Sequence, residues 1–259
     1  MSIWGKIAGA AAGLALGGPL GALLGAIAGH MFIDRETRRE VERAPQYREE
    51  RVARDDRGIR DRDEVAFTIG VIALAAKLAK ADGAVTRDEV DVFKRVFPVP
   101  REQEANVGHL FNLAKQDVSG FDSYAQQLAG LFRSRPGVLE DLLDSLFLIA
   151  KADDRLHPGE LEYLRHVSQI FGFSEGEFQR IRASHFGPDH EDPYVILGVE
   201  RSISDEDLKK AYHRLVRENH PDSMIARGVP EEFVKLANEK VAAINGAYDI
   251  VKKQRGIVG

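Results

Sequence analysis

Residues 204–222 read SDEDLKKAYHRLVRENHPD and predict an amphipathic helix that ends in a turn. Ser204 with Asp207 has the spacing of a capping box, which starts a helix that should run to about Asn219. The apolar positions share one face at helical spacing, namely Leu208, Ala211, Tyr212, Leu215 and Val216. The remaining surface is basic, with Lys209, Lys210, His213, Arg214 and Arg217. One face therefore belongs to a core and another carries positive charge.

A second amphipathic helix is expected after Pro230. Its apolar residues have matching spacing, at Phe233, Leu236, Val241, Ile244, Ala247, Tyr248 and Val251. The two helices can therefore pair antiparallel across the intervening loop. His220-Pro221-Asp222 occupies the near end of that loop. Each feature also has an ordinary explanation, because a histidine at a helix end can satisfy backbone carbonyls and exposed cations can simply confer solubility.

The composition excludes several functional classes. A net charge of -5 over 259 residues argues against a general nucleic-acid binder, because that affinity needs a basic face. The absence of cysteine excludes disulfides, thiol catalysis and cysteine-ligated zinc. No Ser-His-Asp, Walker or zincin pattern is present, so we expect no enzyme. No long segment has strand periodicity, and the expected fold class is all-α.

The amino-terminal residues 1–33 are predicted to be a membrane anchor. Residues 7–33 contain no Asp, Glu, Lys or Arg, and a helix of that length reaches roughly 40 Å, more than the roughly 30 Å hydrocarbon core. Arginines follow it at positions 35, 38, 39 and 43, whereas Lys6 alone precedes it. The positive-inside rule then predicts a single transmembrane helix in a bacterial inner membrane, with the bulk of the chain in the cytoplasm.

Glycine recurs at every fourth position of this segment, from Gly5 to Gly29. Such a stripe lets two helices approach closely in lipid and predicts a homodimer, with the contact at Gly9, Gly13, Gly17, Gly21 and Gly25. Three alternatives remain open. A signal peptide could be cleaved after Ala26-Ile27-Ala28, or Pro19 could divide the segment into a hairpin that only enters the membrane. The many glycines also weaken membrane insertion compared with a leucine-rich span, which would leave a peripheral association.

Composition also suggests the boundaries of the remaining segments. Residues 34–64 are dominated by Arg, Asp and Glu and are expected to be a charged juxtamembrane linker. Residues 65–183 have helical periodicity and should form a helical domain. Residues 184–191 should be a second linker, because Gly187-Pro188 interrupts any helix through it. The last unit spans residues 192–259.

The middle domain contains an acidic repeat, in which Asp82 and Glu89 have the same spacing as Asp153 and Glu160. These four carboxylates are a possible divalent-metal site, because oxygen ligands suit hard cations. An EF-hand is excluded, since a calcium loop needs acids where Lys80 stands. The alternative is helix capping, because Thr86 with Glu89, and His157 followed by Pro158, are helix-start patterns.

Four motifs of the last unit occur in an order that resembles the J domain of the DnaJ family: DPYVILGV at 192–199, AYHRL at 211–215, HPD at 220–222 and INGAY at 244–248. The resemblance implies that His220, Pro221 and Asp222 trigger ATP hydrolysis by a DnaK-type chaperone. It implies likewise that Lys209, Lys210 and Arg214 meet an acidic surface of that partner. His213, Ser223 and Ala242 depart from positions that are often basic in the family.

The rest of the chain extends this resemblance. Residues 65–183 are similar to the TerB-like helical domain, whose acidic turns are associated with divalent metals in some members. With WGKI at 4–7 and GHMFID at 29–34, the whole arrangement resembles the membrane-anchored DjlA co-chaperones. This implies a co-chaperone of protein folding and the stress response, with a TerB-like domain that selects clients or location. The alternative is a metal-sensing adaptor that recruits chaperone through its J domain.

Overall fold

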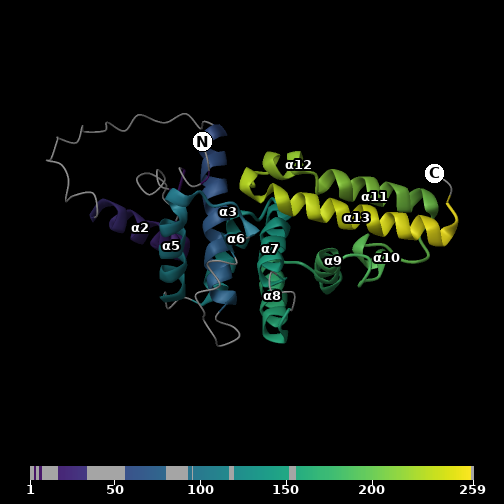
Figure 1. The fold of residues 1–259 in the computed structure, drawn as a ribbon, viewed down its shortest axis with the longest axis horizontal. Coiled ribbons are helices and arrows are strands. Elements are labelled where there is room, and N and C mark those ends of the chain that lie inside the picture. Colours follow the sequence, from purple (N-terminus) through teal and green to yellow (C-terminus); the bar gives the residue numbers. More distant parts are fainter. Residues whose placement is uncertain are drawn as a thin grey trace.

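The computed structural model describes residues 3, 6–7, 17–33, 56–79, 93–94, 96–116, 120–151 and 156–257. Within these residues all regular structure is helical (Figure 1), so the all-α expectation is confirmed. A bundle of helices forms one part of the molecule. A long pair of helices, α11 and α13, extends away from it.

Helix α2 (Gly18–Ile33) departs from the expected single helix over residues 7–33. Gly17 is not helical, and Gly18 has a φ of 67°, which lies in the left-handed region that glycine adopts without strain. Pro19 lacks the N–H that an uninterrupted helix would need, which explains the start at this point. No helix in the described part of the chain is long and apolar enough to cross a membrane.

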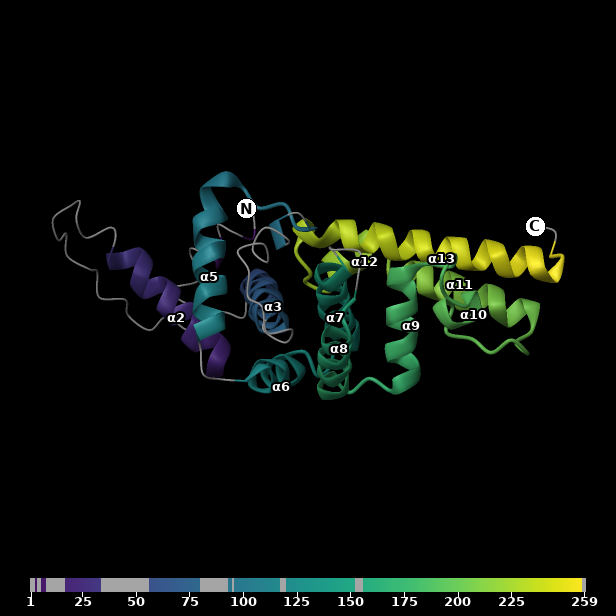
Figure 2. The same ribbon diagram turned by 60° about the horizontal axis from the view of Figure 1, so that its bottom comes forward.

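Contacts with the bundle hold the described amino-terminal residues in place. Helix α2 lies beside α5 (Figure 2) and buries Leu20, Leu23 and Leu24. The backbone N–H of Leu20 donates to the side-chain oxygen of Gln127 at 3.0 Å. Lys6 forms ion pairs with Asp61 at 2.8 Å and Glu64 at 2.6 Å. Through these ion pairs, Lys6 contacts the bundle directly.

Helix α3 (Asp56–Leu78) is the centre of the bundle and begins inside the segment expected to be a charged linker. From Val65 to Ala76 its residues are almost all buried, because α5 (Glu104–Gln116), α6 (Phe121–Leu131) and α7 (Pro136–Ala150) pack around it. A helix that is apolar all round is typical of such a position. A short turn, η1 (Arg101–Gln103), precedes α5.

Two further helices complete this part. Helix α8 (Pro158–Phe171) packs on α6 and α7, and α9 (Glu175–Phe186) packs on α7. Helix α9 ends at Phe186 because Gly187 follows with a φ of 77°. The helix is thus interrupted at Gly187 as expected, but residues 184–186, which were expected in the linker, still belong to α9.

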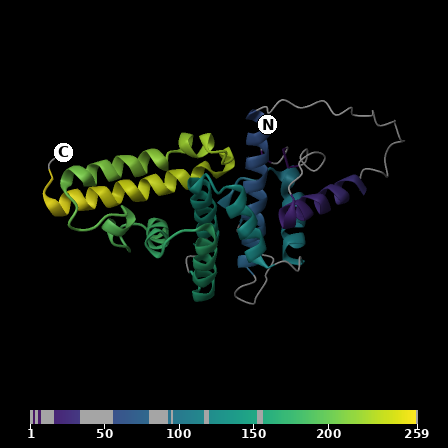
Figure 3. The same ribbon diagram turned by 180° about the vertical axis from the view of Figure 1, so that it is seen from behind.

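The last part of the chain is built on α11 (Asp205–Glu218) and α13 (Val234–Arg255), which run antiparallel (Figure 3). Their shared core contains Leu208, Leu215, Ile244, Ala247 and Val251. The rings of Tyr212 and Tyr248 stack across the pair with their centroids 3.9 Å apart. The short helices α10 (Pro193–Ile196) and α12 (Pro221–Ala226), with the turn η3 (Glu231–Phe233), complete this part.

The beginning of α13 is packed into the bundle. The ring centroid of Phe233 lies 5.0 Å from that of Phe67 and 4.3 Å from that of Phe97. Met224 and Leu236 belong to the same buried cluster as helices α3 and α7. The segment that follows His220-Pro221-Asp222 is thus part of the bundle's own core.

Replacing Phe233 with alanine should remove this shared contact and lower the free energy of unfolding by about 3–5 kcal/mol, because a fully buried ring leaves a cavity. Urea denaturation followed by circular dichroism measures the change. Val195→Ala is the matched control, since that side chain is 38 % exposed. An equal, small loss in both variants would contradict the shared core.

Candidate functional site

The tripeptide at 220–222 forms the beginning of helix α12. The Nδ1 atom of His220 accepts a hydrogen bond from the backbone N–H of Asp222 at 3.2 Å, so the histidine is the N-cap. Pro221 occupies the first turn, where a missing N–H has no cost. The alternative explanation offered for His220, that it binds carbonyls at a helix end, is therefore wrong. Because Nδ1 accepts, a neutral ring keeps its proton on Nε2 as a donor.

The backbone of this tripeptide is held firmly although its side chains are open to solvent. Asp222 has a side chain that is 90 % exposed, and that of His220 is 52 % exposed. Beneath them, the hydroxyl of Ser223 donates to the carbonyl of Arg217 at 2.6 Å, and Met224 is buried. Ser223 therefore ties α12 to the end of α11. The result is an exposed acceptor on a fixed backbone, which suits recognition by a basic group of another protein.

The basic residues expected to dock a partner are all exposed on α11, but their charges are not equivalent. Lys210 forms ion pairs with Glu206 at 2.7 Å and Asp207 at 3.3 Å. Lys209 and Arg214 form no hydrogen bond or ion pair with the residues that the structure describes. Of the three expected docking residues, Lys209 and Arg214 therefore carry charges that no described residue compensates.

A row of acids on α7 was not found by sequence reasoning. Arg227 donates to both carboxylate oxygens of Asp141, with its Nη2 atom 3.0 and 2.7 Å away. Lys240 donates to Asp144 at 2.5 Å and to Glu140 at 2.8 Å. The sequence VLEDLLDSLF at 138–147 places these acids on one helix face, at i, i+1 and i+4, which is also the spacing of a solvated face, so the sequence carried no distinctive signal.

Helix α9 contributes further partners for these acids. Arg180 donates to Glu140 at 2.6 Å, and the Nε2 atom of His185 lies 2.7 Å from the Oδ1 atom of Asp144. The side chains of Asp141 and Asp144 are 1 % and 0 % exposed. Because a buried carboxylate is tolerated only when paired, the bundle and the last part of the chain depend on each other here.

Glu140 and Asp141 differ in their ease of ionisation. Burial opposes ionisation of Glu140, but Lys240 and Arg180 outweigh it and hold the pKa well below its usual value. Burial raises the pKa of Asp141 to about 7, although Arg227 and Lys240 act in the opposite direction. The pKa of Lys240 is raised because its carboxylate neighbours outweigh its burial.

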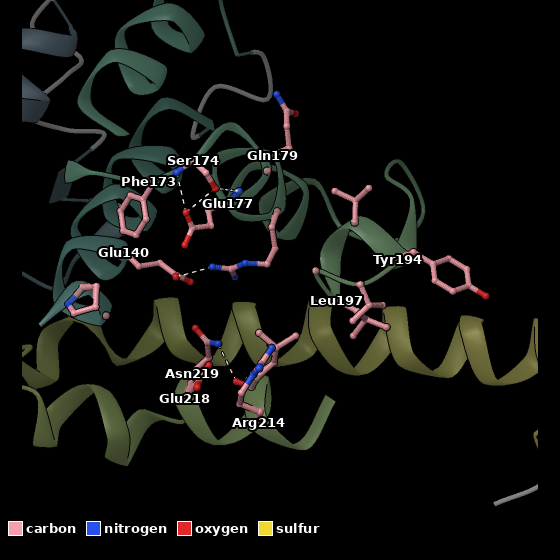
Figure 4. A pocket seen from close by; sticks show the side chains of 18 of the residues that line it. Glu140, Phe173, Ser174, Glu177, Gln179, Tyr194, Leu197, Arg214, Glu218 and Asn219 are labelled. Atoms are coloured by element: carbon pink, nitrogen blue, oxygen red, sulfur yellow. Dashed lines mark hydrogen bonds and ion pairs between the residues drawn. The ribbon is translucent and has the colours of Figure 1, made fainter. Parts of the chain in front are cut away.

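A cavity of about 920 Å³ lies between the bundle and helix α11 (Figure 4). Glu140 and Arg180 line it from the bundle, and Arg214 and Glu218 line it from α11. Arg227 also reaches its wall. Arg214, one of the expected docking residues, therefore faces the space that the two parts of the chain enclose.

The possible metal site is not assembled by the described residues. Asp82, Glu89 and Asp153 lie outside them. The Oε2 atom of Glu160 accepts from the backbone N–H of His157 at 2.8 Å, so this copy is a capping box. The part of the chain that the structure describes has no cluster of three potential metal ligands. Metal binding by the full set stays a prediction.

The glycine stripe is described only in part. Gly9 and Gly13 lie outside the described residues. A Cβ atom added at Gly17 or Gly25 would meet nothing within 4 Å, so these positions face open space. The homodimer stays a prediction.

The ion pairs of Glu140 with Lys240 and Arg180 should make the free energy of unfolding depend on pH in the acidic range. Because the folded-state pKa lies below the ordinary 4.5, the stabilisation is present above about pH 4.5 and is lost as the pH falls further. Glu140→Gln should lower the free energy of unfolding by about 3 kcal/mol at pH 7, since it leaves Lys240 underpaired. This difference from wild type should shrink toward pH 3.

Urea titrations at pH 7, 5 and 3 measure this effect. Glu162→Gln is the matched control, because Glu162 is exposed and makes no contact with the described residues. A difference between wild type and Glu140→Gln that is independent of pH would contradict the assignment.

Three family models match the chain in succession. Residues 1–45 match the co-chaperone DjlA transmembrane domain, residues 68–183 match tellurite resistance protein TerB, and residues 192–256 match the DnaJ domain.

Curated relatives match over most of the chain. The co-chaperone protein DjlA of Photobacterium profundum is 28 % identical over 280 residues, covering 98 % of this chain and 99 % of that protein. The DjlA proteins of Aliivibrio fischeri and Vibrio cholerae are 26 % and 27 % identical, covering 75 % and 74 % of this chain and 80 % and 78 % of their own lengths. No solved structure matches. These relatives, together with the successive matches to the DjlA transmembrane domain, TerB and the DnaJ domain, identify the chain as a DjlA-type protein.

Proposed function

We propose that the J domain of this chain stimulates ATP hydrolysis by a DnaK-type chaperone. The observation that carries the proposal is the exposed His220-Pro221-Asp222 loop on a braced backbone, beside the basic face of α11. The chain is then a regulator, because the partner binds and hydrolyses the ATP.

The two parts of this surface have separate tasks. Lys209 and Arg214 attract an acidic surface of the partner, because exposed charges mainly raise the association rate. Asp222 then accepts from a basic group of the partner, and the Nε2 atom of His220 is free to donate. This division follows from exposure, since all these side chains can be reached without moving the backbone.

His220→Gln should lower the maximal stimulation of the partner ATPase by roughly tenfold or more, because a lost contact of about 1.4 kcal/mol already equals a factor of ten. The helical circular dichroism should not change, since His220 is half exposed. Single-turnover ATPase measurements with a purified DnaK-type chaperone provide the test. His190→Gln is the matched control on an exposed histidine outside the loop. Full stimulation by the His220 variant would exclude the proposed function.

We also propose that residues 1–33 attach the chain to the bacterial inner membrane, with its bulk in the cytoplasm. The match to the DjlA transmembrane domain and the uncharged residues 7–33 support attachment. Four arginines directly after the segment favour a cytoplasmic bulk.

A hairpin that only enters the membrane explains the anchor better than a single pass, because α2 also packs Leu20, Leu23 and Leu24 against the bundle. Helix α2 of 16 residues spans roughly 24 Å, less than the roughly 30 Å hydrocarbon core. The interruption at Gly17 and the ion pairs of Lys6 with Asp61 and Glu64 favour an amino terminus on the cytoplasmic side.

The absence of native cysteine allows this topology to be measured with single cysteines. Ser2→Cys should react with a membrane-impermeant maleimide only after spheroplasts are opened. Ser202→Cys, on the exposed surface of the J domain, should behave in the same way. Labelling of Ser2→Cys in intact spheroplasts would establish a single pass instead. Release of the protein by alkaline carbonate would exclude the anchor.

A further inference from the structure

The guanidinium of Arg227 joins three elements that the TerB and J domains contribute separately. Arg227 follows α12 directly in the chain. Its Nη1 atom donates to the carbonyl of Glu218 at the end of α11, at 2.6 Å. Its Nη2 and Nε atoms donate to Asp141 of α7, with the Nε atom 3.2 Å from the carboxylate. The segment that contains His220-Pro221-Asp222 is thus closed at both ends by one side chain.

The TerB domain is shaped for this side chain. A Cβ atom added at Gly137, one turn before Asp141 on α7, would lie 3.2 Å from the Cδ atom of Arg227 and 3.3 Å from its Nε atom. The side chain of Asp141 is 1 % exposed, and its carboxylate oxygens accept only from Arg227 among the described residues. Movement of Arg227 would therefore leave a buried carboxylate without a partner, which is strongly unfavourable.

Further contacts dock the J domain on the bundle. Lys240 of α13 reaches Asp144 and Glu140 of α7, and Phe233 packs against Phe67 of α3. Attachment of the J domain therefore does not depend on Arg227. The contact of Arg227 with Asp141 and Glu218 therefore serves to fix the loop between α11 and α13.

We propose that Asp141 of the TerB domain is a positioning residue, which holds the His220-Pro221-Asp222 loop in its partner-binding position through Arg227. This inference rests on the proposed stimulation of a DnaK-type ATPase. It gives the TerB domain a direct part in that activity, since a J domain released from α7 would lose the acceptor that closes its loop.

The test distinguishes an effect on the position of the loop from an effect on binding of the partner chaperone. Asp141→Asn keeps the shape of the side chain and removes its charge. It should lower the maximal stimulation of the partner ATPase roughly fivefold or more, a size usual for coupling between sites. The concentration for half-maximal stimulation should stay within about twofold of wild type, because the exposed cations of α11 are untouched. Amide hydrogen exchange of residues 219–226 should become faster. Measurements at pH 8 keep Asp141 ionised, because its pKa is about 7.

Asp63→Asn is the matched control. It removes another nearly buried carboxylate that pairs with an arginine, Arg135 at 2.6 Å. Asp63 packs close to Gly228, but the pair forms no hydrogen bond with residues 219–226. The control should lose stability and keep its maximal stimulation. Arg227→Lys serves as a second variant if Asp141→Asn folds poorly, since lysine keeps the charge but cannot bridge Asp141 and Glu218 together.

The outcomes are distinguishable. If wild type stimulates the ATPase and the folded Asp141→Asn and Arg227→Lys variants match it, the positioning role is overturned. A fall no greater than that of Asp63→Asn would overturn it as well, because general destabilisation would then be sufficient. If wild type gives no stimulation, or His220→Gln stimulates fully, the proposed function itself fails.

Discussion

Buried carboxylates on helix α7 determine how the two domains are joined. Asp141 and Asp144 lie in the interior of the bundle, where an unpaired charge would be strongly destabilising. Their partners Arg227 and Lys240 belong to the J domain, whereas His185 belongs to α9. The apolar contact between Phe233 and Phe67 buries surface but does not fix the relative orientation of the two domains. The ion pairs fix that orientation, because a bidentate contact requires one geometry.

This arrangement explains why the loop can be exposed and still have a single conformation. The side chains of His220 and Asp222 are open to solvent, but the backbone directly after them is fixed by the Ser223 contact with α11 and by the buried Met224. Recognition surfaces that are ordered before binding lose less entropy when a partner arrives. The J domain therefore gains rigidity from a neighbour in the same chain.

Much of the fold could be predicted from the sequence. The pairing of α11 with α13 followed from apolar spacing, and the end of α9 followed from Gly187. The sequence offers an interruption near Pro19 only as an alternative, because the whole segment is uncharged and its hydropathy does not reveal the positive φ of Gly18. The start of α3 was missed because the arginines and acids from 56 to 64 suggest solvation, whereas Asp63 and Glu64 pair with cations from distant segments. The docking of the J domain on α7 could not be predicted from the sequence, since the acids of an apolar helix do not reveal which distant cations pair with them.

The loop lies at the bundle end of the long helix pair, not at its free tip near Gly256 (Figure 1). A chaperone bound at His220 would consequently sit against the TerB domain, within a few side-chain lengths of α7. A polypeptide held by that domain would experience the chaperone at an effective concentration in the millimolar range, as for short tethers. Delivery would then require no affinity between the polypeptide and the J domain, because geometry alone would bring substrate and chaperone together.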